Sequence, residues 1–168
     1  MKKQKIYLET TLFNFCVDES RGKDHINTVK LFERIAAEEY EAFTSVYVVG
    51  ELERAQKDKR DKMVDLITEY DINVIAENDE ALRMRDLYVS KGMIPHKYAM
   101  DSSHIAIASV NGLDMIVSMN FEHIVKEKTI KMTERINVQN GYRSIGIYSP
   151  EEVMKDEKED TSDRAGSK

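Results

Sequence analysis

Short apolar runs alternate with longer segments of helical periodicity along almost the whole chain. Because successive parallel strands need a helical crossover between them, this alternation predicts an α/β fold with a mostly parallel central sheet covered on both faces. The expected strands are 5–9, 42–45, 72–75, 114–118 and 145–148. Expected helices with clear bounds are 24–39, 58–69, 78–92 and 100–110. A further helix is capped by Thr44 or Ser45 and ends near residue 56, and a short one starts at about 121. The last is opened by the capping box Ser149-Pro150-Glu151-Glu152.

The composition is that of a single soluble domain. The 168 residues are 41% hydrophobic and 33% charged, which is enough apolar material for a sizeable core. We expect one domain at 1–154 and a disordered tail at 155–168, because that tail is charged and has no periodicity. Cys16 is the only cysteine, which excludes a disulfide framework and a thiolate zinc site. No segment has the length of a signal-peptide core or a membrane span, so the expected location is the cytoplasm.

Four polar residues stand where the predicted buried elements begin or end. Glu9 ends the first apolar run, and Asn120 follows the run that forms the fourth strand. Glu51 lies in an apolar stretch, and Asp101 opens an almost wholly apolar helix. Carboxylates in such places are costly unless they are paired, protonated or bound to a cation. Ligands gather at the carboxyl ends of parallel strands, so a shared divalent ion would account for all four residues.

Each of these residues also has an ordinary structural interpretation. Glu9 is also consistent with a solvated strand end, and Glu51 with a helix-surface residue paired with Arg54 or Lys57. Asp101 and Asn120 are both residue types that cap helix N-termini, although a cap and a metal ligand are compatible roles. These alternatives stay open at the level of sequence.

Other chemistries find less support. The sequence has no Gly-rich phosphate loop, and no His-x-x-x-His pair suggests zinc. His104 lies one turn after Asp101 among apolar neighbours, which favours a satisfied core histidine. His123 follows Asn120 by three residues and is a candidate substrate contact. The net charge of −6 disfavours general attraction to nucleic acid, and the basic residues at 57–62 and 126–131 are interleaved with acids.

The four polar residues belong to segments that resemble the motifs of the PIN-domain family. Ile6-Tyr7-Leu8-Glu9-Thr10-Thr11-Leu12-Phe13-Asn14 resembles its opening strand, which usually reads hydrophobic-Asp-Thr/Ser. Thr44-Ser45-Val46 with Gly50-Glu51-Leu52 resembles the second motif, and Asp101-Ser102-Ser103-His104-Ile105-Ala106-Ile107-Ala108 resembles the third. Asp114-Met115-Ile116-Val117-Ser118-Met119-Asn120-Phe121 resembles the fourth. The motifs occur in order between residues 4 and 150, and the group that the chain resembles is the VapC-like toxins of toxin–antitoxin systems.

The resemblance implies a three-layer α/β/α sandwich and a ribonuclease that depends on Mg²⁺ or Mn²⁺. It implies that Glu9, Glu51, Asp101 and Asn120 are catalytic, with Glu9, Glu51 and Asp101 as metal ligands. Asn120 would orient a metal-bound water or the phosphate, and Thr10 would support the site by a hydrogen bond. The implied partners are an RNA substrate, a small antitoxin protein and a second copy of the chain in a homodimer.

Two positions depart from the family pattern. Glu9 stands where aspartate is usual, and its extra methylene moves the carboxylate at a site where Mg²⁺ demands near-ideal distances. Asn120 stands in place of aspartate and removes one negative charge. These departures support an alternative, a PIN-fold module that binds RNA or protein without cutting. A third hypothesis is another Rossmann-like phosphohydrolase, which would turn over small phosphate esters.

Overall fold

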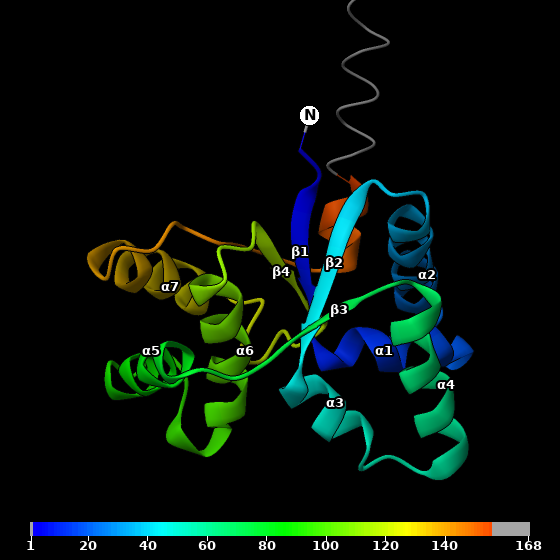
Figure 1. The fold of residues 1–168 in the computed structure, drawn as a ribbon, viewed down its shortest axis with the longest axis horizontal. Coiled ribbons are helices and arrows are strands. Elements are labelled where there is room, and N and C mark those ends of the chain that lie inside the picture. Colours follow the sequence, from blue (N-terminus) through cyan, green and yellow to red (C-terminus); the bar gives the residue numbers. More distant parts are fainter. Residues whose placement is uncertain (1, 156–168) are drawn as a thin grey trace, which may run out of the picture.

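The computed structural model describes residues 2–155, which form a five-stranded sheet between two layers of helices (Figure 1). All strand pairs are parallel, and their order across the sheet is β3-β2-β1-β4-β5. The predicted α/β sandwich is confirmed, and the sheet is wholly rather than mostly parallel. The strands are β1 (Gln4–Leu8), β2 (Tyr40–Ser45), β3 (Asn73–Ile75), β4 (Met115–Val117) and β5 (Gly146–Tyr148).

The helices divide between the two faces of the sheet. Figure 1 shows one layer of α1 (Thr10–Val17), α2 (Lys23–Ala36) and α4 (Lys57–Glu69). The opposite layer contains α5 (Asp79–Ser90), α6 (Ala99–Val110) and α7 (Glu127–Gln139). The short α3 (Val46–Leu52) contacts helices of both layers, namely α1, α4 and α6. It therefore lies where the two layers approach each other beyond the carboxyl ends of β1 and β2.

The central strand places the first candidate residue. β1 pairs with β2 on one side and with β4 on the other. Ile6, Tyr7 and Leu8 are fully buried, as expected for a parallel strand covered on both faces. The Glu9 amide continues the pairing by donating to Val117 O over 3.2 Å. Glu9 therefore lies in the middle of the carboxyl edge of the sheet.

Helix α1 was not predicted. Thr10 and Thr11 were expected at the end of a strand, but a helix starts at Thr10 and buries Leu12 and Phe13. Its N-cap is Glu9, whose backbone is extended and whose side chain accepts a hydrogen bond from Thr11 N. Glutamate is not among the residues that usually mark a helix N-cap, so the sequence carried no ordinary signal for this start.

The prediction of a short helix that starts at about residue 121 is wrong. Residues 121–126 form turns, and the 13-residue helix α7 begins only at Glu127. The turns are held by Asn120, whose backbone oxygen accepts from Ile124 N and Val125 N. The buried face of α7 includes Thr129, Thr133 and Asn137, and these polar residues hid its amphipathic period.

Several predicted caps are confirmed. Ser45 Oγ accepts from Tyr47 N at 3.2 Å, and Asn78 Oδ1 accepts from Ala81 N at 2.8 Å. Ser149 and Glu152 exchange the two hydrogen bonds of a capping box, each 3.2 Å long. Two helices end earlier than expected, at Leu52 rather than near 56 and at Ala36 rather than 39.

The domain boundaries stay a prediction. Apart from Lys155, the tail expected at 155–168 lies outside the described residues. Over residues 2–155, none of the helices combines the length and the apolar character that crossing a membrane requires.

Candidate functional site

A pocket of about 380 Å³ lies at the carboxyl edge of the sheet, and its lining includes the four predicted polar residues. Glu9 comes from the junction of β1 and α1, and Glu51 comes from α3. Asp101 lies in the first turn of α6, and Asn120 follows β4. Thr10 also lines the pocket. The structure thus brings all five residues together, while their chemical roles stay a prediction.

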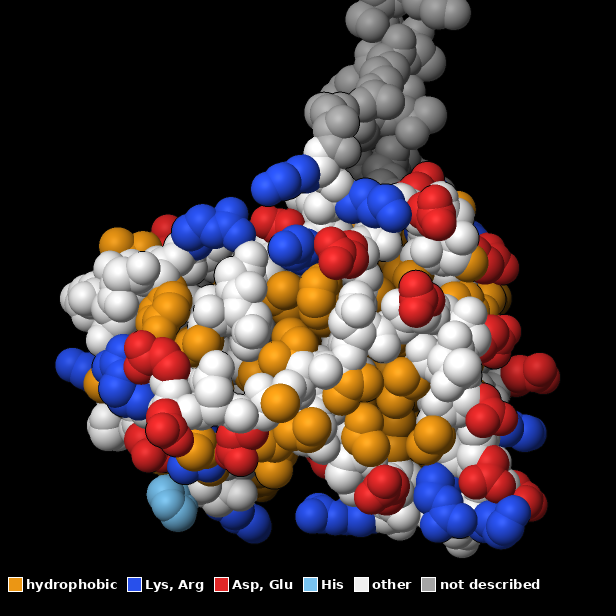
Figure 2. Space-filling view, viewed as in Figure 1, with side chains coloured by type: hydrophobic (Ala, Val, Ile, Leu, Met, Phe, Trp, Pro, Cys, Tyr) orange, Lys and Arg blue, Asp and Glu red, His pale blue; other side chains and the backbone are white. Residues whose placement is uncertain are grey.

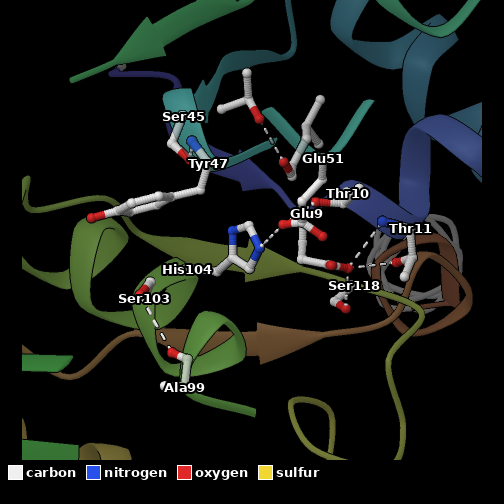
Figure 3. Close-up of polar contacts among 12 residues, drawn as sticks. Glu9, Thr10, Thr11, Ser45, Tyr47, Glu51, Ala99, Ser103, His104 and Ser118 are labelled. Carbon is white, nitrogen blue, oxygen red and sulfur yellow. Dashed lines mark hydrogen bonds and ion pairs between the residues drawn. The ribbon is translucent and has the colours of Figure 1, made fainter. Parts of the chain in front are cut away.

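Glu9 is buried and firmly held. Its side chain is only 3% exposed, so the interpretation as a solvated strand end is wrong. Oε1 accepts from Thr11 Oγ1 at 2.6 Å, from Ser118 Oγ at 2.7 Å and from Thr11 N at 3.2 Å (Figure 3). Within residues 2–155 all hydrogen bonds to this carboxylate reach Oε1. The second oxygen, Oε2, is therefore available to a further ligand.

Glu51 is bound by a histidine. Its Oε1 accepts from His104 Nε2 at 2.8 Å and from Thr10 Oγ1 at 3.0 Å (Figure 3). The expected alternative of a surface pair with Arg54 or Lys57 is wrong, since the bonded partners are Thr10 and His104. Burial raises the pKa of Glu51, but the hydrogen bond and charge of His104 outweigh it, so the net pKa lies below the usual value.

His104 is fully buried, and both of its ring nitrogens are hydrogen-bonded. Nδ1 pairs with Tyr7 OH at 2.7 Å, and that hydroxyl pairs with Ser45 Oγ at 2.7 Å. The expectation of a satisfied core histidine is confirmed. Burial lowers the pKa of His104, but the bonded carboxylate and two nearby acids raise it more, so the net pKa is raised.

Asp101 does not cap α6. The N-cap position is Tyr98, and Asp101 is the third residue of the helix. Burial raises its pKa, the negative charge of Glu9 adds to the rise, and the histidines and a hydrogen bond from the Asn120 side chain oppose it. Its net pKa is raised, because burial of the carboxylate and, to a lesser degree, the charge of Glu9 outweigh the opposing contributions.

Asn120 serves both the turn and the pocket. Its Oδ1 accepts from His123 N at 3.0 Å, so it caps the turn at 121–126 rather than a helix. The same side chain lies close enough to Asp101 to lower the pKa of its carboxyl. This arrangement couples the loop after β4 to the acid on α6.

Three residues near the predicted acids were missed as site residues. His104 was considered only as a core residue, although its spacing one turn after Asp101 was a usable signal. Asn14 lines the pocket, and its Oδ1 is buried with no hydrogen-bond partner in the described part of the chain. Lys59 on α4 places a cation at the pocket. Asn14 could not be found from sequence, because its helix was not predicted.

The acids of the pocket suit a hard cation, and the three carboxylate ligands expected from the resemblance, Glu9, Glu51 and Asp101, stay a prediction. Over the range that the structure describes, no group of three or more His, Cys, Asp or Glu side chains is arranged to hold a metal ion. Glu51 instead bonds to His104. Mg²⁺ is commonly held by one or two carboxylates and completes its shell with water and substrate phosphate. Glu9 Oε2, the Asp101 carboxylate and the unpartnered Asn14 Oδ1 fit that requirement.

The solved structures that resemble this one include two from toxin–antitoxin systems. VapC20 from Mycobacterium tuberculosis, a sarcin-ricin loop cleaving toxin, superposes with a TM-score of 0.52 at 13% identity, over 66% of this chain and 86% of VapC20. VapBC2 from Rickettsia felis, solved with a DNA fragment from its promoter, gives a TM-score of 0.55 at 14% identity. That match covers 87% of this chain and 98% of the other. No protein-family model and no curated protein matches the sequence.

At these identities the likeness is one of fold. The resemblance to VapC-like PIN domains, first drawn from four short motifs, is confirmed at that level. The chain has a PIN-like α/β/α fold, and the pocket lies where its four motifs meet.

Proposed function

We propose that the protein is a metal-dependent endoribonuclease and the toxin component of a VapBC-like system. The observation that carries the proposal is the convergence of Glu9, Asp101 and Asn120 in one pocket at the carboxyl edge of a VapC-like fold. VapC20 is a toxin that cleaves the sarcin-ricin loop, and cleavage of an RNA is the reaction proposed for this chain.

The chemistry that such a pocket must support is attack of water on an anionic phosphodiester. A bound Mg²⁺ or Mn²⁺ would screen the phosphate charge and lower the pKa of a coordinated water. Glu9 through Oε2 and Asp101 are the residues that would hold the ion, and Glu51 would contact it directly or through water. The raised pKa of Asp101 supports this assignment, because a cation would offset both the cost of burying this charge and its repulsion by Glu9.

The remaining residues position these acids. The Asn120 amide lies near Asp101 and would orient it together with the water or phosphate. Thr10 and His104 hold Glu51, which limits the rotamers that this carboxylate can adopt. Lys59 is placed to contact a substrate phosphate from the α4 side of the pocket.

Partners are proposed on the same basis. The VapBC2 proteins are bound to a DNA fragment from their promoter, which supports a small antitoxin partner for this chain. A homodimer and a cytoplasmic location stay predictions, as does the identity of the RNA.

The test is cleavage of single-stranded RNA by the purified chain with Mg²⁺ or Mn²⁺ and with EDTA. Cleavage should require the ion, and millimolar ion should raise the melting temperature because it binds only the folded form. Asp101→Asn should reduce that shift. A melting temperature indifferent to divalent ions, together with no cleavage, would refute the proposal.

One observation favours a second candidate, a PIN-fold module that binds without cutting. Glu51 bonds to His104, and within residues 2–155 no three acids or histidines form a ready metal site. Metal-independent RNA binding with no cleavage, in both the wild type and Glu9→Asp, would select this candidate. Turnover of small phosphate esters would instead select a phosphohydrolase.

A further inference from the structure

Exposed aromatic and apolar side chains flank the acids of the pocket. Tyr98, Met100 and Phe121 are 37%, 42% and 54% exposed, although side chains of this size are usually covered. Tyr98 and Met100 precede Asp101 on the chain, and Phe121 directly follows Asn120. Two separate segments thus carry exposed uncharged side chains, one beside Asp101 in the sequence and the other beside Asn120.

Tyr98 is already part of a stack. Its ring lies on that of His123, with 4.1 Å between the centroids and 30° between the planes. Lys97 Nζ lies 5.7 Å from the centroid of the Tyr98 ring. His123 Nε2 is buried without a hydrogen-bond partner in the described chain, and Glu122 Oε1, at 3.6 Å, is too distant to be one. The histidine therefore supports the tyrosine mainly by stacking.

Hydrogen bonds connect this stack to the pocket residue Asn120. His123 N donates to Asn120 Oδ1 at 3.0 Å, and Thr129 Oγ1 donates to His123 O at 2.6 Å. Asn120 and Asp101 both line the pocket. A molecule lying on Tyr98 would therefore lie beside the pocket that contains the acids.

We propose that Tyr98, backed by His123, is a stacking platform for one unpaired nucleobase of single-stranded RNA. The inference rests on the proposed function, since the adjoining phosphate would lie in the acidic pocket. Unpaired bases stack on aromatic rings without regard to sequence, whereas the bases of a duplex are already stacked on each other. The platform therefore selects single-stranded over double-stranded RNA.

Charge explains why such a platform is needed. The chain carries a net charge of −6, and the pocket acids repel a phosphodiester. Figure 2 shows basic and acidic side chains mixed over the face that it draws, with no extended basic field. Stacking supplies affinity without net charge, and Lys97 places a single cation beside the ring for the neighbouring phosphate.

The experiment measures binding of a short single-stranded oligoribonucleotide that carries the fluorescent base 2-aminopurine, in EDTA, at several salt concentrations. Binding should quench the fluorescence. Tyr98→Ala should weaken binding roughly tenfold, as for one stacked base, and leave the salt dependence unchanged. Tyr98→Phe should bind as the wild type does, and Tyr98→Leu should bind as weakly as Tyr98→Ala, because leucine has no aromatic face.

Two variants calibrate the result. Lys59→Ala should lower the salt dependence, since it removes a cation at the pocket. Val138→Ala removes an exposed apolar side chain on α7 and should change neither affinity nor salt dependence. Melting temperatures of all variants show whether each is folded.

Several outcomes would overturn the platform. Absence of binding by the wild type, or equal binding by Tyr98→Ala, excludes a stacked base. Full binding by Tyr98→Leu would mean a general apolar contact, and would favour a protein partner on this surface. If Tyr98→Ala cleaves RNA with Mg²⁺ at an unchanged KM, the proposed platform is wrong and the proposed nuclease function stands. If the wild type quenches the fluorescence but does not cleave RNA, the platform stands and the proposed nuclease function is wrong.

Discussion

Helix α6 carries two buried polar clusters that differ in charge. The pocket cluster consists of Tyr7, Glu51 and His104, and it ends at the pocket through Glu51. The neutral cluster consists of Tyr88, Ser109 and Asn137, from α5, α6 and α7. Asn137 Nδ2 donates to Ser109 Oγ at 2.8 Å, and Tyr88 OH donates to Asn137 Oδ1 and, at 3.4 Å, to Ser109 Oγ.

The comparison distinguishes buried polar groups that stabilise the fold from polar groups that also serve the pocket. The neutral cluster closes on itself and joins the helices of one layer, so its hydrogen bonds have no evident task beyond stability. The pocket cluster fully buries a titratable histidine, which is costly, and leaves its partly buried carboxylate open to the pocket. Perturbed pKa values beside a pocket are typical of functional sites.

The largest expected effect is that of Asp101→Asn on RNA cleavage. The substitution keeps the size of the side chain but removes a charge that would hold the metal ion. Cleavage should fall by at least about 100-fold, while the free energy of unfolding should be unchanged or higher, because burial disfavours the Asp101 charge. Single-turnover cleavage rates and urea unfolding curves measure the two quantities. Loss of stability with retained cleavage would mean that the acids of the pocket stabilise the fold and do not serve the reaction.

Asn137→Ala should act in the opposite way. It should lower the free energy of unfolding by about 2–3 kcal/mol, because it removes a fully buried amide and leaves the partner hydroxyls of Tyr88 and Ser109 poorly paired. The cleavage rate should stay within about twofold of the wild type. The exposed neighbour Gln139→Ala is the matched control and should change stability by less than about 0.5 kcal/mol.

The neutral cluster also predicts a pH dependence at the alkaline end. Burial raises the pKa of Tyr88 to about 12 from the ordinary value of 10.0. The neutral Tyr88 phenol therefore contributes stability to the folded state. This contribution is fully present below pH 10.0 and is lost as the pH rises towards about 12. The total is about 3 kcal/mol, since one pKa unit corresponds to about 1.4 kcal/mol. Urea unfolding at about pH 8 and about pH 11 should show a smaller loss in Tyr88→Phe than in the wild type; an equal loss would assign the dependence to other tyrosines.

Glu9→Asp should produce the smallest change. The longer side chain lets Oε1 reach Ser118 and Thr11 while Oε2 stays available. Aspartate would shorten that reach, so cleavage should fall severalfold, on the order of 1 kcal/mol in the barrier. An unchanged or faster rate would mean that glutamate merely misplaces the metal ion. The Tyr98 variants above, which leave the acids intact, provide the comparison for effects on binding alone.

The sequence predicted the sheet and the meeting of the acids because both depend on local patterns. Apolar runs mark buried strands, and parallel strands bring their carboxyl ends to one edge whatever the details of the helices. It did not predict α1 or the start of α7, because Glu9 is an unusual cap and polar residues occupy the buried face of α7. The bond between Glu51 and His104 joins residues 53 positions apart, and no local spacing encodes it.

The position of Glu9 at the end of the central strand has a consequence for how the pocket responds to its ligands. Its amide hydrogen bonds to Val117 O and lies between paired strands on both sides, so we expect it to exchange with solvent deuterium only when the whole domain opens. The turns at 121–126, which carry Phe121 and His123, belong to no such ladder and are expected to exchange sooner. A ligand would therefore meet one wall of the pocket that is fixed and another that can adjust.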